Sequence, residues 1–235
     1  MKQWKTAAVL GVLLALGLAW GGSYMKSAAQ VWEQSQRSIT VKGLAEREVK
    51  ADLAMWPLKF TVSANTLAEL DTRLLAAEQK VRAFFREAGL AEKDISQTVP
   101  RITDEYANRY NENKPEERYS AESILLVRTK EVDKVLTAMA KTNVLLRQNV
   151  LLAPTYEYRT EFLFTSLEDI KPEMIAEATQ DARTAAQQFA QDSGSRVGDI
   201  VTAYQGYFSI EDLDGYTPHI KRVRVVTTIK YGLDD

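Results

Sequence analysis

Residues 1–29 constrain this chain more than any other stretch. They have the pattern of a targeting segment, so only the residues after them are expected to form the globular fold. Two lysines precede an apolar run from Thr6 to Trp20, and the first acidic residue of the chain is Glu33. A basic start followed by an apolar stretch is typical of a signal for export across a membrane. We therefore expect residues 38–235 to fold in the periplasm.

Two fates of this segment are compatible with the sequence. Residues 6–25 are 20 mostly apolar residues, which as a helix span about 30 Å and suffice to cross a bilayer. Left uncleaved, they tether the protein to the inner membrane with Lys2 and Lys5 on the cytoplasmic side. Alternatively, the small residues 27–29 permit cleavage by a signal peptidase. We expect the uncleaved anchor, followed by a polar linker at residues 30–37.

The composition excludes several kinds of chemistry. The chain has no cysteine, so disulfides, thiol catalysis and cysteine-based zinc sites are excluded. Residues 1–29 hold three of the 30 basic residues and none of the 32 acidic ones, so the remainder has a net charge near −5. Motifs of phosphate-binding loops, serine hydrolases and zinc proteases do not occur in it. We therefore expect no catalytic residue, no metal, no cofactor and no nucleic-acid partner, and we do not expect an enzyme.

Two features resemble functional motifs without meeting their requirements. His219 is the only histidine and begins a strand-like run, which favours a structural or exposed residue over a catalytic one. The acidic stretch 211–215 resembles a calcium loop, but that alignment places Ile210 and Lys221 at the first and last ligand positions. We interpret the stretch as an exposed turn.

The periodicity of apolar residues predicts alternating strands and helices in one domain, residues 38–235. Strands are expected at about 39–43, 46–64, 95–109, 118–129, 145–164, 198–209 and 219–232, and helices at 66–88, 131–143 and 170–193. With the first two strand segments taken as one element, the order is β-α-β-β-α-β followed by α-β-β, and its first six elements have the ferredoxin-like order of a split βαβ unit. We expect an α+β fold with one largely antiparallel sheet, helices on one side, and a preceding hydrophobic helix.

The helices have signals for their ends and their buried faces. Thr66 and Glu69 form a capping box, Gly89 ends the first helix, and Gly194 is expected in a left-handed cap after the third. Pro57 cannot donate a hydrogen bond, which predicts a sheet edge or a bulge there. The residues expected to face inward are Leu67, Leu70, Leu74, Ala77, Val81, Phe84 and Ala88 in the first helix, and Met174, Ala178, Ala182, Ala185 and Phe189 in the third.

Aromatic residues on the strands are candidates for a contact between copies of the chain. We expect Tyr156, Tyr158, Tyr207 and Phe208 to lie at or near such contacts, because aromatic residues are enriched at protein interfaces. Ordinary packing across strands is the alternative. Sheet edges also pair readily with another copy, so we expect a homo-oligomer.

Three stretches of the sequence recur together in a known family. They are Ile39–Gly43 followed by Val49, Asp52, Leu53 and Ala54; Tyr119–Ala121 with the strand to Arg128 and the helix from Val132; and Ala176–Ile200, an alanine-rich helix with a stop at Gly194. Through them, residues 38–232 resemble the SIMPL (DUF541) family of bacterial envelope proteins. Ala51 and Leu44 depart from the family pattern, which usually has proline before the aspartate and a small or acidic residue after the glycine.

The resemblance implies a function but no chemistry. The family includes oxidative-stress defence proteins and a periplasmic immunogenic protein, and ring-like assemblies occur in it. It therefore implies a non-enzymatic, self-associating envelope protein linked to tolerance of oxidative stress. Its shared positions are mainly structural glycines, alanines and strand residues, so none is carried over as catalytic. The alternative is a periplasmic module that binds a client protein or a small molecule, whose identity the sequence does not give.

Overall fold

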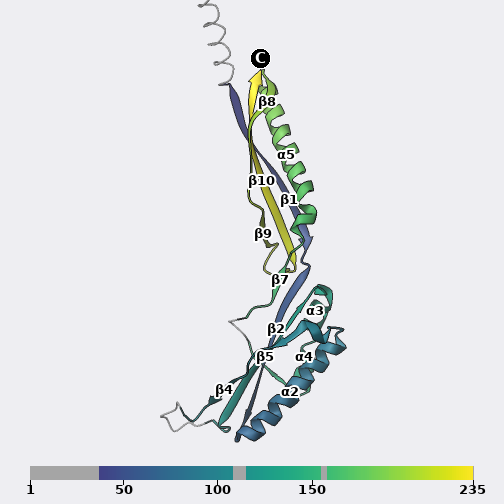
Figure 1. The fold of residues 1–235 in the computed structure, drawn as a ribbon, viewed down its shortest axis with the longest axis vertical. Coiled ribbons are helices and arrows are strands. Elements are labelled where there is room, and N and C mark those ends of the chain that lie inside the picture. Colours follow the sequence, from purple (N-terminus) through teal and green to yellow (C-terminus); the bar gives the residue numbers. More distant parts are fainter. Residues whose placement is uncertain (1–36, 108–114, 155–157, 235) are drawn as a thin grey trace, which may run out of the picture. The chain divides into compact units, whose positions relative to one another are not determined.

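The computed structural model describes residues 37–234, except 108–114 and 155–157 (Figure 1). The expected hydrophobic helix at the N-terminus and Tyr156 lie outside the described residues. Over the described part the fold is α+β, with two antiparallel sheets and the helices α2 (Leu67–Glu87), α3 (Val132–Met139), α4 (Asn143–Arg147) and α5 (Leu167–Asp192). None of these helices is both long and apolar enough to span a membrane.

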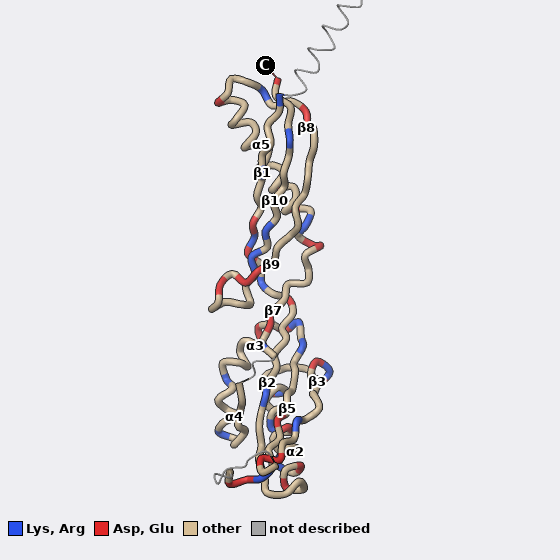
Figure 2. Tube along the Cα trace, turned by 90° about the vertical axis from the view of Figure 1, so that its left-hand side faces the viewer, with Lys and Arg blue, Asp and Glu red and all other residues tan. Residues whose placement is uncertain are grey.

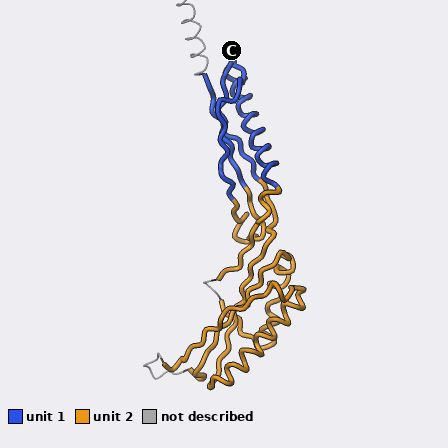
Figure 3. The backbone as a smooth tube through the Cα atoms, viewed as in Figure 1, with its two compact units in different colours: residues 1–46, 170–209, 224–235 blue, residues 47–169, 210–223 orange. Residues whose placement is uncertain are grey.

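The chain forms two compact units, shown in separate colours in Figure 3. Unit 1 contains residues 1–46, 170–209 and 224–235, and unit 2 contains residues 47–169 and 210–223. The α+β class is confirmed, but the expectation of a single sheet is wrong. The first strand pairs with the last strand of the chain and forms a second sheet with it. Alternation along a strand shows which face is buried and does not identify the neighbouring strand, so the pattern did not separate the two sheets.

The sheet of unit 2 is built on one long antiparallel pair. Strand β2 (Leu53–Ala64) pairs with β5 (Tyr119–Thr129) from Ala54 opposite Thr129 to Ala64 opposite Tyr119. Two short strands, β3 (Ile95–Gln97) and β4 (Arg101–Asp104), flank β5, and β6 (Leu151–Leu152) and β7 (Glu161–Leu163) flank β2. Unit 2 therefore runs β2-α2-β3-β4-β5-α3-α4-β6-β7, which has more strands and helices than the predicted order β-α-β-β-α-β.

Helix α2 and strand β2 together provide half of the buried core residues of unit 2. The helices α2, α3 and α4 lie on the same side of the sheet (Figure 1). Trp56 of β2 packs edge-on against Phe84 and Phe85, with ring centroids 6.4 and 5.3 Å apart. The buried residues of α2 are Leu70, Leu74, Ala77, Val81, Phe84 and Phe85. The Thr66 side chain accepts a hydrogen bond from the Glu69 backbone, so the Thr66 half of the predicted capping box is confirmed, and the Glu69 carboxylate accepts from Arg73.

Three predictions for unit 2 differ from the structure: the buried position of Leu67, the strand at 145–164 and the effect of Pro57. Leu67 is 56 % exposed because it is the first residue of α2, and Phe85 occupies the buried position four residues after Val81. The strand expected at 145–164 is replaced by the end of α4 and by the short strands β6 and β7. Pro57 lies in a central strand whose register with β5 has no shift. The interruption predicted by this proline falls in the neighbour, because β6 and β7 pair with residues on either side of it.

Unit 1 contains a sheet covered by one helix. Its strands are β1 (Ser38–Lys50), β10 (Ile220–Asp234) and β8 (Arg196–Gln205) in that order, and β9 (Ser209–Asp212) also pairs with β10. Strands β1, β9 and β10 and helix α5 include residues of both units. Lysine and arginine positions are interspersed with acidic ones along both units (Figure 2).

Helix α5 lies against β1 with almost no space between the two backbones. A Cβ atom placed on Gly43 would come within 1.9 Å of the Ala178 carbonyl oxygen and 2.4 Å of the Ala182 backbone nitrogen. Both distances are far below van der Waals contact, so only glycine fits at position 43. Beside this contact, the Leu44 backbone N–H donates to Asp181 Oδ2 of α5 at 2.9 Å.

The close approach also selects which face of α5 is buried. The buried residues of this helix follow a spacing of four: Met174, Ala178, Ala182, Ala186 and Ala190. The prediction that Ala185 and Phe189 face inward is wrong. Both residues are exposed, and Phe189 is 50 % exposed. A phenylalanine beneath the helix would separate α5 from the sheet, whereas alanine permits the contact at Gly43.

Helix α5 ends as predicted. Gly194 has a φ of 71°, and the Ser195 N–H donates to the Ala190 carbonyl at 2.8 Å. A left-handed residue with this hydrogen bond is the Schellman motif of helix C-termini.

The contact at Gly43 generates a test. We expect Gly43→Ala to lower the free energy of unfolding by about 3 kcal/mol, at the upper end for overpacked sites, because the added methyl group meets backbone atoms. Urea unfolding of the purified chain measures the change. Gly215→Ala is the matched control, since no atom lies within 4 Å of its added Cβ. Equal midpoints for the two variants would show that α5 is not held at this distance.

Candidate functional site

The predicted interface residues lie in different parts of the chain. Tyr158 is 49 % exposed in unit 2, and Tyr207 is 91 % exposed in unit 1. Phe208, adjacent to Tyr207, is half-buried. Within the described residues, the structure therefore brings together only Tyr207 and Phe208, which follow strand β8.

Strand β8 is itself an exposed apolar edge. In the described part of the unit 1 sheet it pairs only with β10, and every residue from Asp199 to Gln205 is exposed. Ile200, Val201 and Tyr204 are 49, 51 and 61 % exposed. Helix α5 packs on β1 and β10, and only Val197 of β8 joins the core beneath it. The sequence analysis missed Ile200, Val201 and Tyr204. The signal was available, because Ile200 and Val201 are adjacent and one of two consecutive strand residues must point away from the core.

A polar hollow borders this edge. Its volume is about 630 Å³, and its lining residues include Arg183 and Gln187 of α5 and Asp199 of β8. The pairing of β8 with β10 shifts register on both sides of Tyr231, and such bulges redirect side chains of an edge strand. Arg183 and Asp199 are both exposed, and neither forms an ion pair among the described residues. Among the described residues, two opposite charges without an ion pair thus lie beside the open edge of β8.

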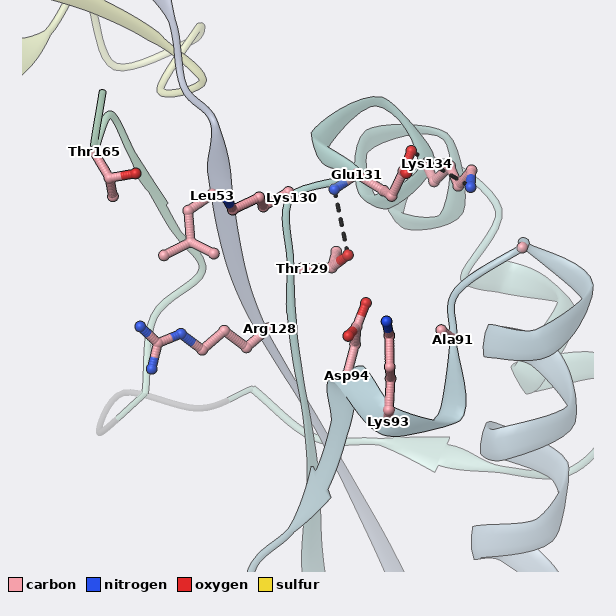
Figure 4. Close-up of a pocket in the computed structure, with 11 residues that line it drawn as sticks. Leu53, Ala91, Lys93, Asp94, Arg128, Thr129, Lys130, Glu131, Lys134 and Thr165 are labelled. Atoms are coloured by element: carbon pink, nitrogen blue, oxygen red, sulfur yellow. Dashed lines mark hydrogen bonds and ion pairs between the residues drawn. The ribbon is translucent and has the colours of Figure 1, made fainter. Parts of the chain in front are cut away.

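A second pocket, of about 690 Å³, lies in unit 2 (Figure 4). It forms where the turn after α2, the end of β5 and the start of α3 meet. Its lining residues are Leu53, Gly89, Ala91, Lys93, Asp94, Arg128, Thr129, Lys130, Glu131, Lys134 and Thr165. Four of these side chains are basic and two are acidic, so the lining has an excess of positive charge.

The charges of this pocket form two groups. Figure 4 shows Arg128 and Lys130 extending toward Leu53 and Thr165, whereas Lys93 lies across β5 with both acidic side chains. Glu131 is already paired, because its Oε2 lies 3.4 Å from Lys134 Nζ. Among the described residues, no ion pair is formed by Arg128, Lys130 or Lys93.

The acidic residues singled out from the sequence have structural roles. Asp214 accepts hydrogen bonds from the backbone N–H groups of Tyr216 and Thr217 at 2.7 Å, and these bonds lower its pKa below the ordinary value. Asp212 pairs with Lys221. The His219 ring packs edge-on against Phe162 at 6.1 Å. No group of three potential ligands that could hold a metal ion occurs within the described residues.

Asp52 supports the segment that leads into α5. Its Oδ1 accepts from the Thr165 backbone and hydroxyl at 2.8 and 3.0 Å, and its Oδ2 accepts from the Ser166 backbone at 2.9 Å. Burial raises the pKa of this carboxyl, but the hydrogen bonds from Ser166 and Thr165 outweigh it and hold the pKa below its ordinary value. The position belongs to the first of the three stretches that carry the family resemblance.

A comparison with known protein families identifies the family of this chain. Residues 39–223 match the SIMPL family, described as a protein of unknown function (DUF541). The chain therefore belongs to the SIMPL family, as the three stretches predicted, and the family description names no activity. A search of curated proteins found no match.

The role of Asp52 predicts a pH dependence. Because its pKa is lower in the folded protein, the stability it contributes is present above its unfolded pKa of about 4 and is lost as pH falls through the folded value. We expect Asp52→Asn to unfold more easily than the natural chain at pH 7, by about 1–2 kcal/mol, with the difference vanishing toward pH 2. Asp71→Asn, which changes an exposed carboxyl on α2, is the control. A constant difference between Asp52→Asn and the natural chain across this range would contradict the assignment.

Proposed function

We propose that this protein is a non-enzymatic component of the cell envelope that self-associates through strand β8. The single observation that carries the proposal is an edge strand with exposed Ile200, Val201 and Tyr204, continued by Tyr207. An edge strand presents unpaired backbone groups, and native proteins usually protect it with charged residues or a covering element. A link to tolerance of oxidative stress is supported by the family resemblance alone.

The occupant that fits β8 best is the same strand of a second copy. Two β8 strands related by a two-fold axis pair antiparallel, and every contact then occurs twice. With the axis close to Ile200, Arg183 of one copy lies near Asp199 of the other. This arrangement supplies each of the two unpaired charges with a partner.

The envelope location is supported by residues 1–29. Their basic start and apolar run have the pattern of an export signal, and the uncleaved form would hold the protein at the inner membrane.

We expect a fusion of residues 1–40 to export a reporter that is active only in the periplasm. A fusion in which Leu13 and Leu14 are both replaced by Lys is the control, because charges in the apolar run block insertion. An inactive reporter on the natural segment would contradict the proposed location. The mass of the native protein then separates the two fates, since a mature chain beginning at Gln30 would show cleavage.

Charge reversal tests the self-association. We expect the natural chain to form oligomers at tens of micromolar, measured by light scattering, and Arg183→Glu or Asp199→Lys alone to lower the molar mass. Mixing these two variants should restore it, because each mixed interface regains two opposite-charge pairs. Tyr207→Ser with Phe208→Ser should also lower the molar mass while the chain stays folded.

The mixture separates contacts between copies from contacts within one copy. If the two residues interacted within a chain, mixing would leave the molar mass low, and only a double reversal in one chain would restore it. A natural chain that is monomeric at these concentrations would contradict self-association as a whole.

A further inference from the structure

The charged pocket of unit 2 carries an inference that does not depend on self-association. It gathers three basic side chains that form no ion pair among the described residues: Lys93 from the turn after α2, Arg128 from β5 and Lys130 just beyond that strand. Like charges gathered in one pocket repel one another. A bound anion removes that repulsion and adds charge-assisted hydrogen bonds.

We propose that this pocket binds an extended anion with several phosphate groups. Arg128 and Lys130 are two residues apart at the end of a strand, so their side chains share one face. Both acidic side chains of the lining lie on the other side of β5, with Lys93 (Figure 4). The side with Arg128 and Lys130 is thus the more positive part of the lining.

Most acidic groups in or beside the pocket are already engaged. Glu131 pairs with Lys134, and Asp133 pairs with Lys50. Asp52, which precedes the lining residue Leu53, accepts hydrogen bonds from Thr165 and Ser166 with its two carboxylate oxygens. Asp94 is the remaining acidic side chain of the lining, and it lies beside Lys93 in Figure 4.

The spacing of the charges determines the kind of anion. Arg128 and Lys130 lie on one side of β5 and Lys93 on the other (Figure 4), so we expect a chain of linked phosphates, and not a single phosphate, to contact both groups. Arginine suits this role because its planar guanidinium donates two parallel hydrogen bonds to one phosphate. Binding should therefore strengthen with the number of linked phosphates.

Calorimetric titration of the full-length chain in a neutral detergent tests the proposal. The probes are orthophosphate, pyrophosphate and tripolyphosphate at low salt, and we expect affinity to rise at least tenfold from the first to the last. Arg128→Gln with Lys130→Gln should weaken tripolyphosphate binding at least tenfold. Lys93→Gln should weaken tripolyphosphate severalfold and leave orthophosphate unchanged. A bound anion should also raise the melting temperature of the natural chain.

The matched control is Lys42→Gln with Arg101→Gln, which removes two exposed positive charges outside the pocket lining. If this control weakens binding as much as the pocket variant, the effect is general surface charge and the proposal is wrong. Affinity independent of phosphate number, or no binding by the natural chain, also overturns it. Melting temperatures without anion show whether each variant is folded.

A second arm separates the two sources of such phosphates. Phosphatidylcholine vesicles with and without phosphatidylglycerol are presented to the same variants. Tripolyphosphate binding without vesicle binding identifies a soluble ligand. Binding to phosphatidylglycerol vesicles that is lost in the Arg128→Gln, Lys130→Gln variant identifies lipid headgroups, and either result supports the site.

Discussion

The contact between Gly43 and helix α5 determines the rest of unit 1. Because the two backbones touch, the helix presents only small residues to β1, and Ala178 and Ala182 occupy the point of closest approach. The larger side chains of α5, such as Phe189 and Arg183, are therefore exposed. A helix held this closely covers the strands directly beneath it and extends little beyond them. Strand β8 remains largely uncovered for this reason, and the exposed apolar edge is a consequence of tight packing elsewhere in the same unit.

The two edge strands of the unit 1 sheet, β1 and β8, differ in how their exposed groups are covered. At the β1 edge, the Leu44 N–H donates a hydrogen bond to Asp181 of α5. This backbone donor is therefore already used and does not pair with another strand. At the β8 edge, the exposed residues include the apolar side chains Ile200, Val201 and Tyr204, whose burial against another apolar surface is favourable. In the proposed self-association, this difference between the edges would direct pairing to one side of the sheet, which favours assemblies of defined geometry over open aggregation.

The sequence predicted what local patterns determine. The Thr66 cap, the buried stripe from Leu70 to Phe84, the turn at Gly194 and the family were all readable, because each depends on residues close together in the chain. The pairing of strands was not, since β1 and β10 lie at opposite ends of the described residues and alternate like any other strands. The buried face of α5 was predicted only as far as Ala182, because the choice between Phe189 and Ala190 depends on how close the sheet lies. The charged pocket was missed because Lys93 is far in sequence from Arg128 and Lys130.

The pairing of β1 with β10 also determines when each unit is able to form. The sheet of unit 2 joins strands within residues 53–163, whereas the sheet of unit 1 joins strand 38–50 to strand 220–234. Closing so long a loop before any contact forms is entropically costly, and non-local pairing slows folding. During synthesis, the first strand must therefore wait without its partner until almost the whole chain is available. Strand β1 is thus synthesised before the strands of unit 2 but is among the last to pair.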